Sequence, residues 1–329
     1  MTDLKLTQNF SLIALNAQNS RYMTTVKKVA LRCMAAAAIL EWYLNDSFTQ
    51  TDNKLIVQED ILNQVSTMLY CETVFKALLH KKRRNSTLEW WLKQASSLSN
   101  RKLVKFEHAI ADSLKEMNLL EEIPNLLGCD LYYDTAGVEV KEYRSNIQEY
   151  TAITENIRAE ILEDGSVTDE TICMLWLLRE SGCMHDFFSQ NELEKVADRM
   201  NELYQSSSLA KAVFPIRIHR GIEIAVKQFL RTKKKIIKTR VGSGVNFVFP
   251  FLERSQSVFI DTEAWFSNAN ERLNDVKKRL LFNGHAVLVL NEGPIAIIKI
   301  DNIVYKAVPQ AIYGDIPIHG VRLLPKRPI

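Results

Sequence analysis

Residues of the types that carry catalysis are sparse in this chain of 329 residues and stand far apart. Cys183 and His185 place a thiol near an imidazole, but they lack the further ligands that a zinc ion requires. The segment Gly242-Ser-Gly244 lacks the third glycine and the following helix of a phosphate-binding loop. The six histidines are scattered, so spacing assembles no set of Ser, His and Asp. We therefore predict no catalytic residue, no metal ligand and no cofactor, and an enzyme is the less favoured class.

Clusters of basic residues are the stronger chemical signal, because a formal net charge of only +3 does not by itself indicate a polyanionic partner. Each basic residue near an acidic membrane contributes about 1 kcal/mol, and the same residues could pair with nucleic-acid phosphates. Charge runs of this kind are also typical of solvated linkers between helices, so all three interpretations stay open. The two clusters are made of Lys81, Lys82, Arg83 and Arg84, and of Arg231, Lys233, Lys234 and Lys235.

A central helix, around which the other helices should pack, is predicted within Ser166–Phe188. Its middle, Ile172–Leu178, is apolar without a break, so at 3.6 residues per turn it leaves no face for solvent. It is also far shorter than the ~20 apolar residues of a membrane span. Thr168 or Asp169 suits the start of this helix, and Gly182 suits its end. We expect a central helix that is buried among other helices.

Glycine and proline divide the sequence into a helical part and a part rich in turns. No glycine precedes Gly128 and no proline precedes Pro124, whereas six of each follow Val241. Apolar spacing predicts the helices, and two short β-prone runs predict a β-hairpin at 129–133 and 138–140. The remaining helices are expected at 4–17, 26–44, 61–79, from 86 onward, 100–120, 142–162, 191–204 and 221–230.

The last quarter has the pattern of a small α+β unit, with strands at 245–249, 258–260, 286–290, 295–300 and 303–308 and one helix at 267–282. The predicted fold class is mainly α. A multi-helix domain with one β-hairpin around the central helix covers residues 1–230. A basic linker follows at 231–240, and the smaller α+β domain covers 241–329. No basic and apolar leader opens the sequence, and the five cysteines form no C-x-x-C pair, so we expect a cytoplasmic chain with reduced thiols.

Four stretches of the helical part resemble, in their order and spacing, the Golgi phosphoprotein 3-like family. They are Leu6–Leu15, Ala35–Leu44 with its Ile39-Leu-Glu41, Ser113–Leu120 before the hairpin, and Asp169–Phe188 followed by Lys211–Val213. The resemblance covers roughly residues 5–230. It implies a mostly helical domain that binds phosphatidylinositol 4-phosphate at a membrane surface. We also expect a possible homo-oligomer formed through the hairpin at 129–140.

The lipid pocket of that family uses one tryptophan and three arginines, and this chain retains none of them. The corresponding positions hold Val26, Ala35, Val104 and Glu107, and a carboxylate at the last one would repel a phosphate. The nearest substitutes form two groups of basic residues, which are the candidate headgroup-binding residues unless they only solvate helix faces. One group is Lys27, Lys28 and Arg32, and the other is Arg101, Lys102 and Lys105.

The function predicted from these observations is binding rather than catalysis, with anionic lipid headgroups as the ligand. A winged-helix-like nucleic-acid binder is the alternative, because two helices, a hairpin and a helix also outline that module. An unassigned hydrolase in the C-terminal unit is a distant third. A lipid binder needs basic residues on one flat face near exposed apolar groups, whereas a DNA reader needs them along the helix before the hairpin.

Overall fold

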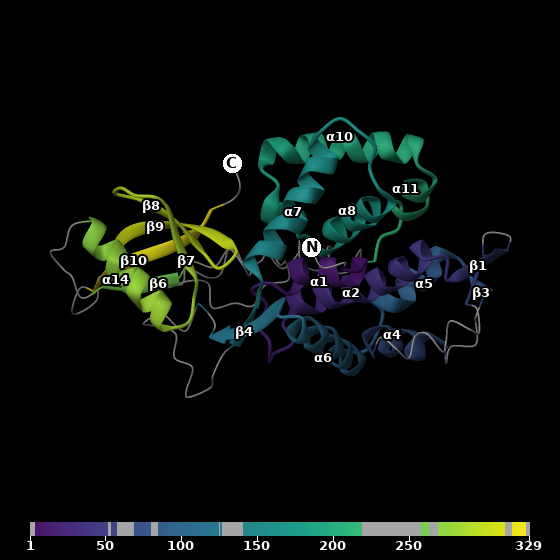
Figure 1. The fold of residues 1–329 in the computed structure, drawn as a ribbon, viewed down its shortest axis with the longest axis horizontal. Coiled ribbons are helices and arrows are strands. Elements are labelled where there is room, and N and C mark those ends of the chain that lie inside the picture. Colours follow the sequence, from purple (N-terminus) through teal and green to yellow (C-terminus); the bar gives the residue numbers. More distant parts are fainter. Residues whose placement is uncertain are drawn as a thin grey trace, which may run out of the picture.

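The computed structural model describes residues 4–51, 54–57, 69–79, 85–124, 126, 141–218, 258–262, 269–312 and 318–326. The protein is mainly α, with a five-stranded sheet in its C-terminal region. Two hydrophobic cores hold it together, a large one built by residues between 4 and 218 and a small one built by residues between 258 and 323, which Leu126 joins. Figure 1 shows the helical part on the right and the sheet on the left.

The helical part contains most of the helices that the sequence predicts. A small antiparallel sheet interrupts them, and none of its three strands was predicted. These strands are β1 (Phe48–Thr51), β2 (Lys54–Val57) and β3 (Asn85–Ser86). The predicted helix at 61–79 is described only as α4, and residues 61–68 lie outside the described residues. The helices are α1 (Leu6–Leu15), α2 (Thr25–Leu44), α4 (Leu69–Leu79), α5 (Leu88–Ser96), α6 (Asn100–Glu116), α7 (Ile147–Leu162), α8 (Asp169–Ser181), α9 (Met184–Phe187), α10 (Gln190–Ser206) and α11 (Ser208–Val213).

The prediction of a buried central helix is confirmed in α8. Every residue of Ile172–Leu178 is buried, and the Nε1 of Trp176 donates to the carbonyl of Ile216 at 2.9 Å. The side chain of Thr168 accepts from the amide of Thr171, and Gly182 ends the helix with φ 77°. Helix α2 packs against α8, α1 and α5, and its run of four alanines, Ala35–Ala38, has no exposed surface.

An antiparallel strand pair flanks the segment in which the β-hairpin was predicted. Strand β4 (Leu120–Pro124) pairs with β5 (Lys141–Ser145) in antiparallel register, whereas the predicted strands at 129–133 and 138–140 lie outside the described residues. The helix predicted at 100–120 therefore ends at Glu116, and the one predicted from 142 begins at Ile147. Asn146 caps α7 by accepting from the amides of Gln148 and Glu149.

Residues 141–145 form the strand β5, although a helix was predicted from 142, because their backbone groups form hydrogen bonds with other segments on both edges of the strand. On the side opposite β4, the Ala17 amide donates to the Tyr143 carbonyl at 2.8 Å and the Tyr143 amide donates to the Gln18 carbonyl at 2.9 Å. The Ser20 amide donates to the Lys141 carbonyl. Pairing on two edges satisfies the backbone groups that a helix would otherwise satisfy.

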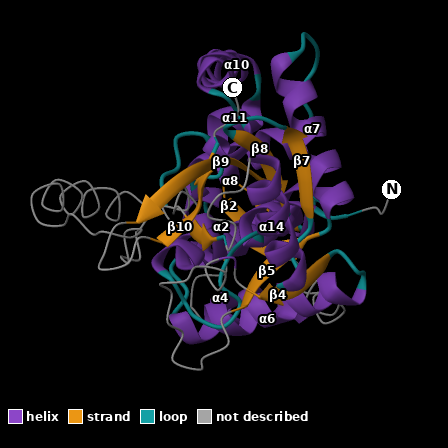
Figure 2. Cartoon of the chain, turned by 90° about the vertical axis from the view of Figure 1, so that its left-hand side faces the viewer, coloured by secondary structure: helices purple, strands orange, loops and turns teal. Residues whose placement is uncertain are grey.

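The C-terminal unit is an antiparallel sheet with one helix on it. Its elements are β6 (Val258–Asp261), α14 (Ala269–Phe282), β7 (Val287–Asn291), β8 (Ala296–Ile300), β9 (Ile303–Ile312) and β10 (Ile318–Pro325), in the strand order β6-β10-β9-β8-β7. Helix α14 packs on this sheet, and its residues Leu273, Val276 and Leu280 belong to the small core. Figure 2 shows α14 among the strands of the sheet. The predicted meander is confirmed, and β10 was missed.

The boundary between the two predicted domains lies outside the described residues, which exclude 219–257. The predictions of a helix at 221–230, a basic linker at 231–240 and a strand at 245–249 therefore stay predictions, and so does the domain division itself. Within the described part of the chain, no helix has both the length and the apolar composition needed to cross a bilayer.

Candidate functional sites

Three basic residues at the start of α6 form an exposed group, which we call the α6 basic stripe: Arg101, Lys102 and Lys105. Spacings of three and four residues place Lys105 beside both Lys102 and Arg101 on the surface of the helix. Within the described residues none of them has an ion-pair partner. Other basic residues of the helical part do pair, as in the contacts Lys93–Glu89, Lys115–Glu122 and Arg158–Glu192.

The position of the α6 basic stripe opposes the helix dipole. The N-terminus of a helix carries partial positive charge, so a cation there costs typically 0.3–1 kcal/mol. Helix α6 has no acidic residue in its first turn, and the side chain of its N-cap, Ser99, makes no capping bond. By contrast, α5, α7, α8 and α10 all carry an acid in the first turn. The start of α6 therefore exposes three cations that have no ion-pair partner among the described residues, and no side chain caps the helix there.

Lys27 is not on the surface. Its Nζ lies 2.6 Å from Glu107 Oε1, with both side chains 2% exposed, and donates to the carbonyl of Asn19 at 2.7 Å. Tyr143 donates its hydroxyl to the same carboxylate oxygen at 3.1 Å. Burial lowers the pKa of Lys27 and raises the pKa of Glu107, and the contact between them opposes both shifts. A solution anion therefore has no access to Lys27.

The remaining candidates of that group, Lys28 and Arg32, are half-buried on α2. Arg32 keeps its Nε buried without a hydrogen-bond partner among the described residues, and burial lowers the pKa of its guanidinium. Nothing in the described structure bonds these two side chains to the α6 basic stripe. The positions that correspond to the family pocket are filled, since Val26, Ala35 and Glu107 are buried. The clusters at 81–84 and 231–235 lie outside the described residues.

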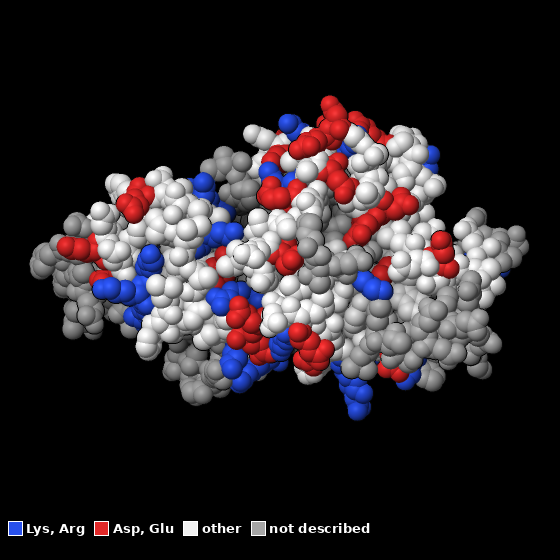
Figure 3. Space-filling model, in the orientation of Figure 1, with Lys and Arg blue, Asp and Glu red and all other residues white. Residues whose placement is uncertain are grey.

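Two hollows in the structure do not suit an anion. A groove of about 350 Å³ between α1, α7 and α8 is lined by Glu149, Glu160 and Glu170 and by no lysine or arginine. Residues 147–218 carry 13 acidic against 6 basic residues. Figure 3 shows acidic side chains gathered over the top of the helical part, where Figure 1 places α7 and α10, whereas basic and acidic side chains mix along its lower edge.

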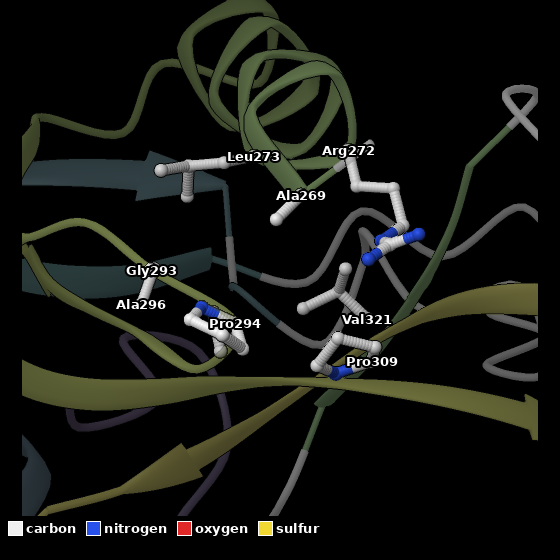
Figure 4. Close-up of a pocket in the computed structure, with 9 residues that line it drawn as sticks. Ala269, Arg272, Leu273, Gly293, Pro294, Ala296, Pro309 and Val321 are labelled. Carbon is white, nitrogen blue, oxygen red and sulfur yellow. The ribbon is translucent and has the colours of Figure 1, made fainter. Parts of the chain in front are cut away.

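The second hollow lies in the C-terminal unit between α14 and the sheet, as Figure 4 shows. Its volume of about 10 Å³ is no more than the space for one water molecule. Arg272 reaches over it from α14, opposite Pro294 and Pro309. This hollow is too small for a substrate or a headgroup.

The described cysteines are poor nucleophiles. Cys33, Cys71, Cys173 and Cys183 form no disulfide, and all four are buried. Burial raises the pKa of Cys71 to about 12 and also raises those of Cys33 and Cys173, so these thiols stay protonated at neutral pH.

A polar cluster that was not predicted from the sequence lies at the junction of the two cores. Glu142 on β5, His285 before β7 and Asp301 in the β8–β9 turn place ligand atoms within 4.8 Å of one another. The three residues are separated by more than a hundred positions and then by sixteen, so no spacing rule links them. Only the tertiary contact of β5 with the C-terminal unit brings them together.

Hydrogen bonds fix this cluster, which we call the junction cluster. Asp301 Oδ2 lies 2.9 Å from His285 Nδ1, and Asp301 Oδ1 accepts from Arg144 Nη1 at 2.8 Å and from the Ala286 amide at 3.0 Å. Burial would raise the pKa of Asp301, but its bonds with His285 and Arg144 hold that pKa below its usual value. Asn302 donates to the side chain of Asn16 at 2.9 Å. Both units thus contribute to one buried polar contact.

Comparison with known proteins adds no assignment to these sites. No family model matches the chain, and no curated protein matches its sequence.

Proposed function

We propose that this protein is a non-enzymatic, peripheral binder of anionic lipid headgroups and that the α6 basic stripe is its contact surface. The observation that carries the proposal is the exposure of Arg101, Lys102 and Lys105 without an ion-pair partner among the described residues, at the end of a helix whose dipole also attracts anions. Such an arrangement costs stability, and a phosphate would offset that cost. The resemblance to the Golgi phosphoprotein 3-like family supports the same class of ligand.

The expected affinity is weak and salt-dependent. At about 1 kcal/mol for each basic residue near an acidic surface, the stripe contributes about 3 kcal/mol, or roughly a 100-fold preference for acidic over neutral membranes. Lysines supply charge without the fixed geometry of paired guanidinium contacts. We therefore expect no preference for phosphatidylinositol 4-phosphate over other lipids of equal charge.

Sedimentation with vesicles tests the proposal. The double variant Lys102→Gln/Lys105→Gln should lose binding to vesicles rich in phosphatidylserine. The matched control is Lys195→Gln/Lys211→Gln, which removes the same charge from exposed positions on α10 and α11. Binding of the wild type should disappear with phosphatidylcholine vesicles and at about 1 M salt, where the Debye length is roughly 3 Å. Equal losses in both double variants would contradict the stripe as the contact surface.

A nucleic-acid binder is the second candidate, and one observation favours it. Helix α6 directly precedes the β4–β5 hairpin, and among the described residues no large exposed apolar side chain lies on α6. Against it, the exposed C-terminal half of α6 carries Asp112 and Glu116, which would repel a phosphate backbone. Binding of a labelled duplex that is lost in Lys102→Gln/Lys105→Gln, together with no vesicle binding by the wild type, would replace the first proposal with this one.

A further inference from the structure

The junction cluster has the composition of a metal site. It offers one imidazole and two carboxylates, and their ligand atoms lie within 4.8 Å of one another. Carboxylate and imidazole together suit first-row divalent transition metals, whereas Mg²⁺ and Ca²⁺ prefer oxygen ligands alone. This cluster is independent of the α6 basic stripe in both residues and chemistry.

The distances inside the cluster fit a cation. A metal with bonds of about 2.1 Å places adjacent ligands at right angles roughly 3 Å apart. His285 Nδ1 and Asp301 Oδ2 are 2.9 Å apart. Asp301 Oδ1 is already held by Arg144 and by the Ala286 amide, so Oδ2 is the oxygen that turns toward the imidazole. Ligands that are oriented by such outer bonds lose little freedom when a metal enters.

The imidazole of His285 is enclosed by the protein. The His285 side chain is 0% exposed, and its Nε2 is buried without a hydrogen-bond partner among the described residues. Solvent therefore does not reach the ring, so water does not compete with the protein for a cation at this point.

We propose that Glu142, His285 and Asp301 bind one divalent transition-metal cation, of the Zn²⁺ or Mn²⁺ kind, at the junction of the two hydrophobic cores. Glu142 belongs to β5, which the helical part holds on both edges, and His285 and Asp301 belong to the C-terminal unit. The cation therefore links the two units. Burial of the cluster leaves it a structural role, since a substrate would need open access.

Titration of the full-length, metal-free protein tests the site. Isothermal calorimetry with Zn²⁺ and with Mn²⁺ should give one ion per chain, with Zn²⁺ the tighter of the two as for most nitrogen and oxygen ligand sets, and Mg²⁺ should not bind at comparable concentrations. The thermal midpoint of the protein should rise with added Zn²⁺. An absence of stoichiometric binding by the wild type would overturn the proposal whatever the variants do.

Variants locate the ion. His285→Gln and Glu142→Gln should each weaken Zn²⁺ binding at least tenfold. The control His108→Gln removes an exposed histidine of α6, and Glu163→Gln removes an exposed carboxylate at the end of α7, so both should bind as the wild type does. Circular dichroism of each metal-free variant checks that it is folded. If His285→Gln fails to fold, Glu142→Gln decides, and unchanged affinity in it would show that the ion binds elsewhere.

Discussion

Lys27 and Lys102 carry the same ammonium group in opposite surroundings. Lys27 is buried against Glu107 on the inner side of α6, and Lys102 is exposed at the start of the same helix. From the sequence, both lysines were predicted as headgroup-binding residues. The spacing of residues along a helix does not show which lysine will form a buried ion pair with a carboxylate from another helix. A ligand can reach Lys102 directly, whereas it can reach Lys27 only if a buried ion pair opens.

Glu107→Ala should lower the free energy of unfolding by about 3 to 5 kcal/mol, because it leaves Lys27 buried without a counter-charge. Replacing both partners in Lys27→Met/Glu107→Met should restore most of this loss, apart from about 1 kcal/mol each for the Tyr143 hydroxyl and the Asn19 carbonyl, which lose their bonds to these side chains. Urea denaturation of the wild type and both variants measures the two values. A double variant as unstable as the single one would mean that the charge of Lys27 is not the cause.

Glu41 makes a pH-dependent contribution to stability. Burial raises the pKa of its carboxyl, against the bonds from Thr7, whose amide donates to Oε2 at 2.9 Å. The folded state then keeps a proton that the unfolded chain has released, so the stability from this group is present below the ordinary value of 4.5 and is lost as the pH rises through the folded value.

Glu41→Gln removes this titration while its amide oxygen can still accept from Thr7. The stability of the variant relative to the wild type should therefore increase from acidic to neutral pH. Urea denaturation of the variant and the wild type, at one acidic and one neutral pH, measures the difference in their free energies of unfolding. Glu163→Gln is the control for removing an exposed carboxylate. A relative stability that stays constant with pH would show that Glu41 does not titrate in this range.

At the scale of the element, the first turn of α6 carries basic residues where the helix dipole favours acidic ones. Lys102 occupies the third position after the N-cap Ser99, where a glutamate would complete a capping box. Lys102→Glu should therefore raise the free energy of unfolding by about 0.5 to 1 kcal/mol and weaken binding to acidic vesicles. Lys105→Glu, one turn further on, should weaken vesicle binding without the gain in stability. Denaturation and sedimentation of both variants test this, and a stabilised Lys102→Glu protein with unchanged vesicle binding would contradict the proposed function.

Helix α8 should be the most sensitive helix to truncation of a side chain. Trp176 is fully buried and bonded to Ile216, so Trp176→Ala should cost about 3 to 5 kcal/mol. Trp90 on α5 is only half-buried, and Trp90→Ala should cost clearly less. Chemical denaturation compares them, and a loss below about 1 kcal/mol for Trp176→Ala would place the centre of the core elsewhere.

Helices whose capping and apolar spacing agree were predicted from the sequence, and elements set by long-range pairing were not. Helix α8 has Thr168 and Gly182 at its two ends, so its position follows from local chemistry. Strand β5 contains Glu142, Tyr143 and Arg144, which also suit a helix, and its backbone partners lie on β4 and at residues 17–20. Strand β10 contains Gly320 and ends at Pro325, two residue types that disfavour a strand prediction. It forms because it pairs with β6 on one edge and with β9 on the other.

The candidate sites divide in the same way. The α6 basic stripe could be predicted because its members are neighbours in the sequence and their exposure follows from helical spacing. The junction cluster could not, because Glu142 meets His285 and Asp301 only through the tertiary contact between β5 and the β8–β9 turn. His285 and Asp301 stand in a loop and a turn, where side-chain direction depends on the backbone. Asp301 has a positive φ of 52°, which aims its carboxylate at the junction.

At the scale of the whole molecule, a few polar side chains join the two cores, in addition to the apolar contact of Leu126 with the small core. Asn302 donates to Asn16 at 2.9 Å and to the Ser145 carbonyl at 3.0 Å, and Arg144 bonds the Gly284 carbonyl at 2.9 Å. Asn302→Ala should cost about 1 to 3 kcal/mol and should split thermal unfolding into two transitions, because each core then melts with less dependence on the other. Calorimetry detects the split. Asn283→Ala is the control, since its side chain bonds Arg279 within the C-terminal unit, and a single transition in Asn302→Ala would show that other contacts couple the cores.

The order of strands in the C-terminal sheet has a consequence for how the chain is made. Strand β6 is the first of the five to leave the ribosome, but its one neighbour in the sheet is β10, the last of them. The bond between Asn16 and Asn302 closes a loop of 286 residues. Contacts of such long range form slowly, and domains generally fold as units during synthesis, N-terminal part first. The helical part can therefore be complete while the sheet is still open, so that the exposed edge of β6 and the unfilled junction are the features that a chaperone would meet.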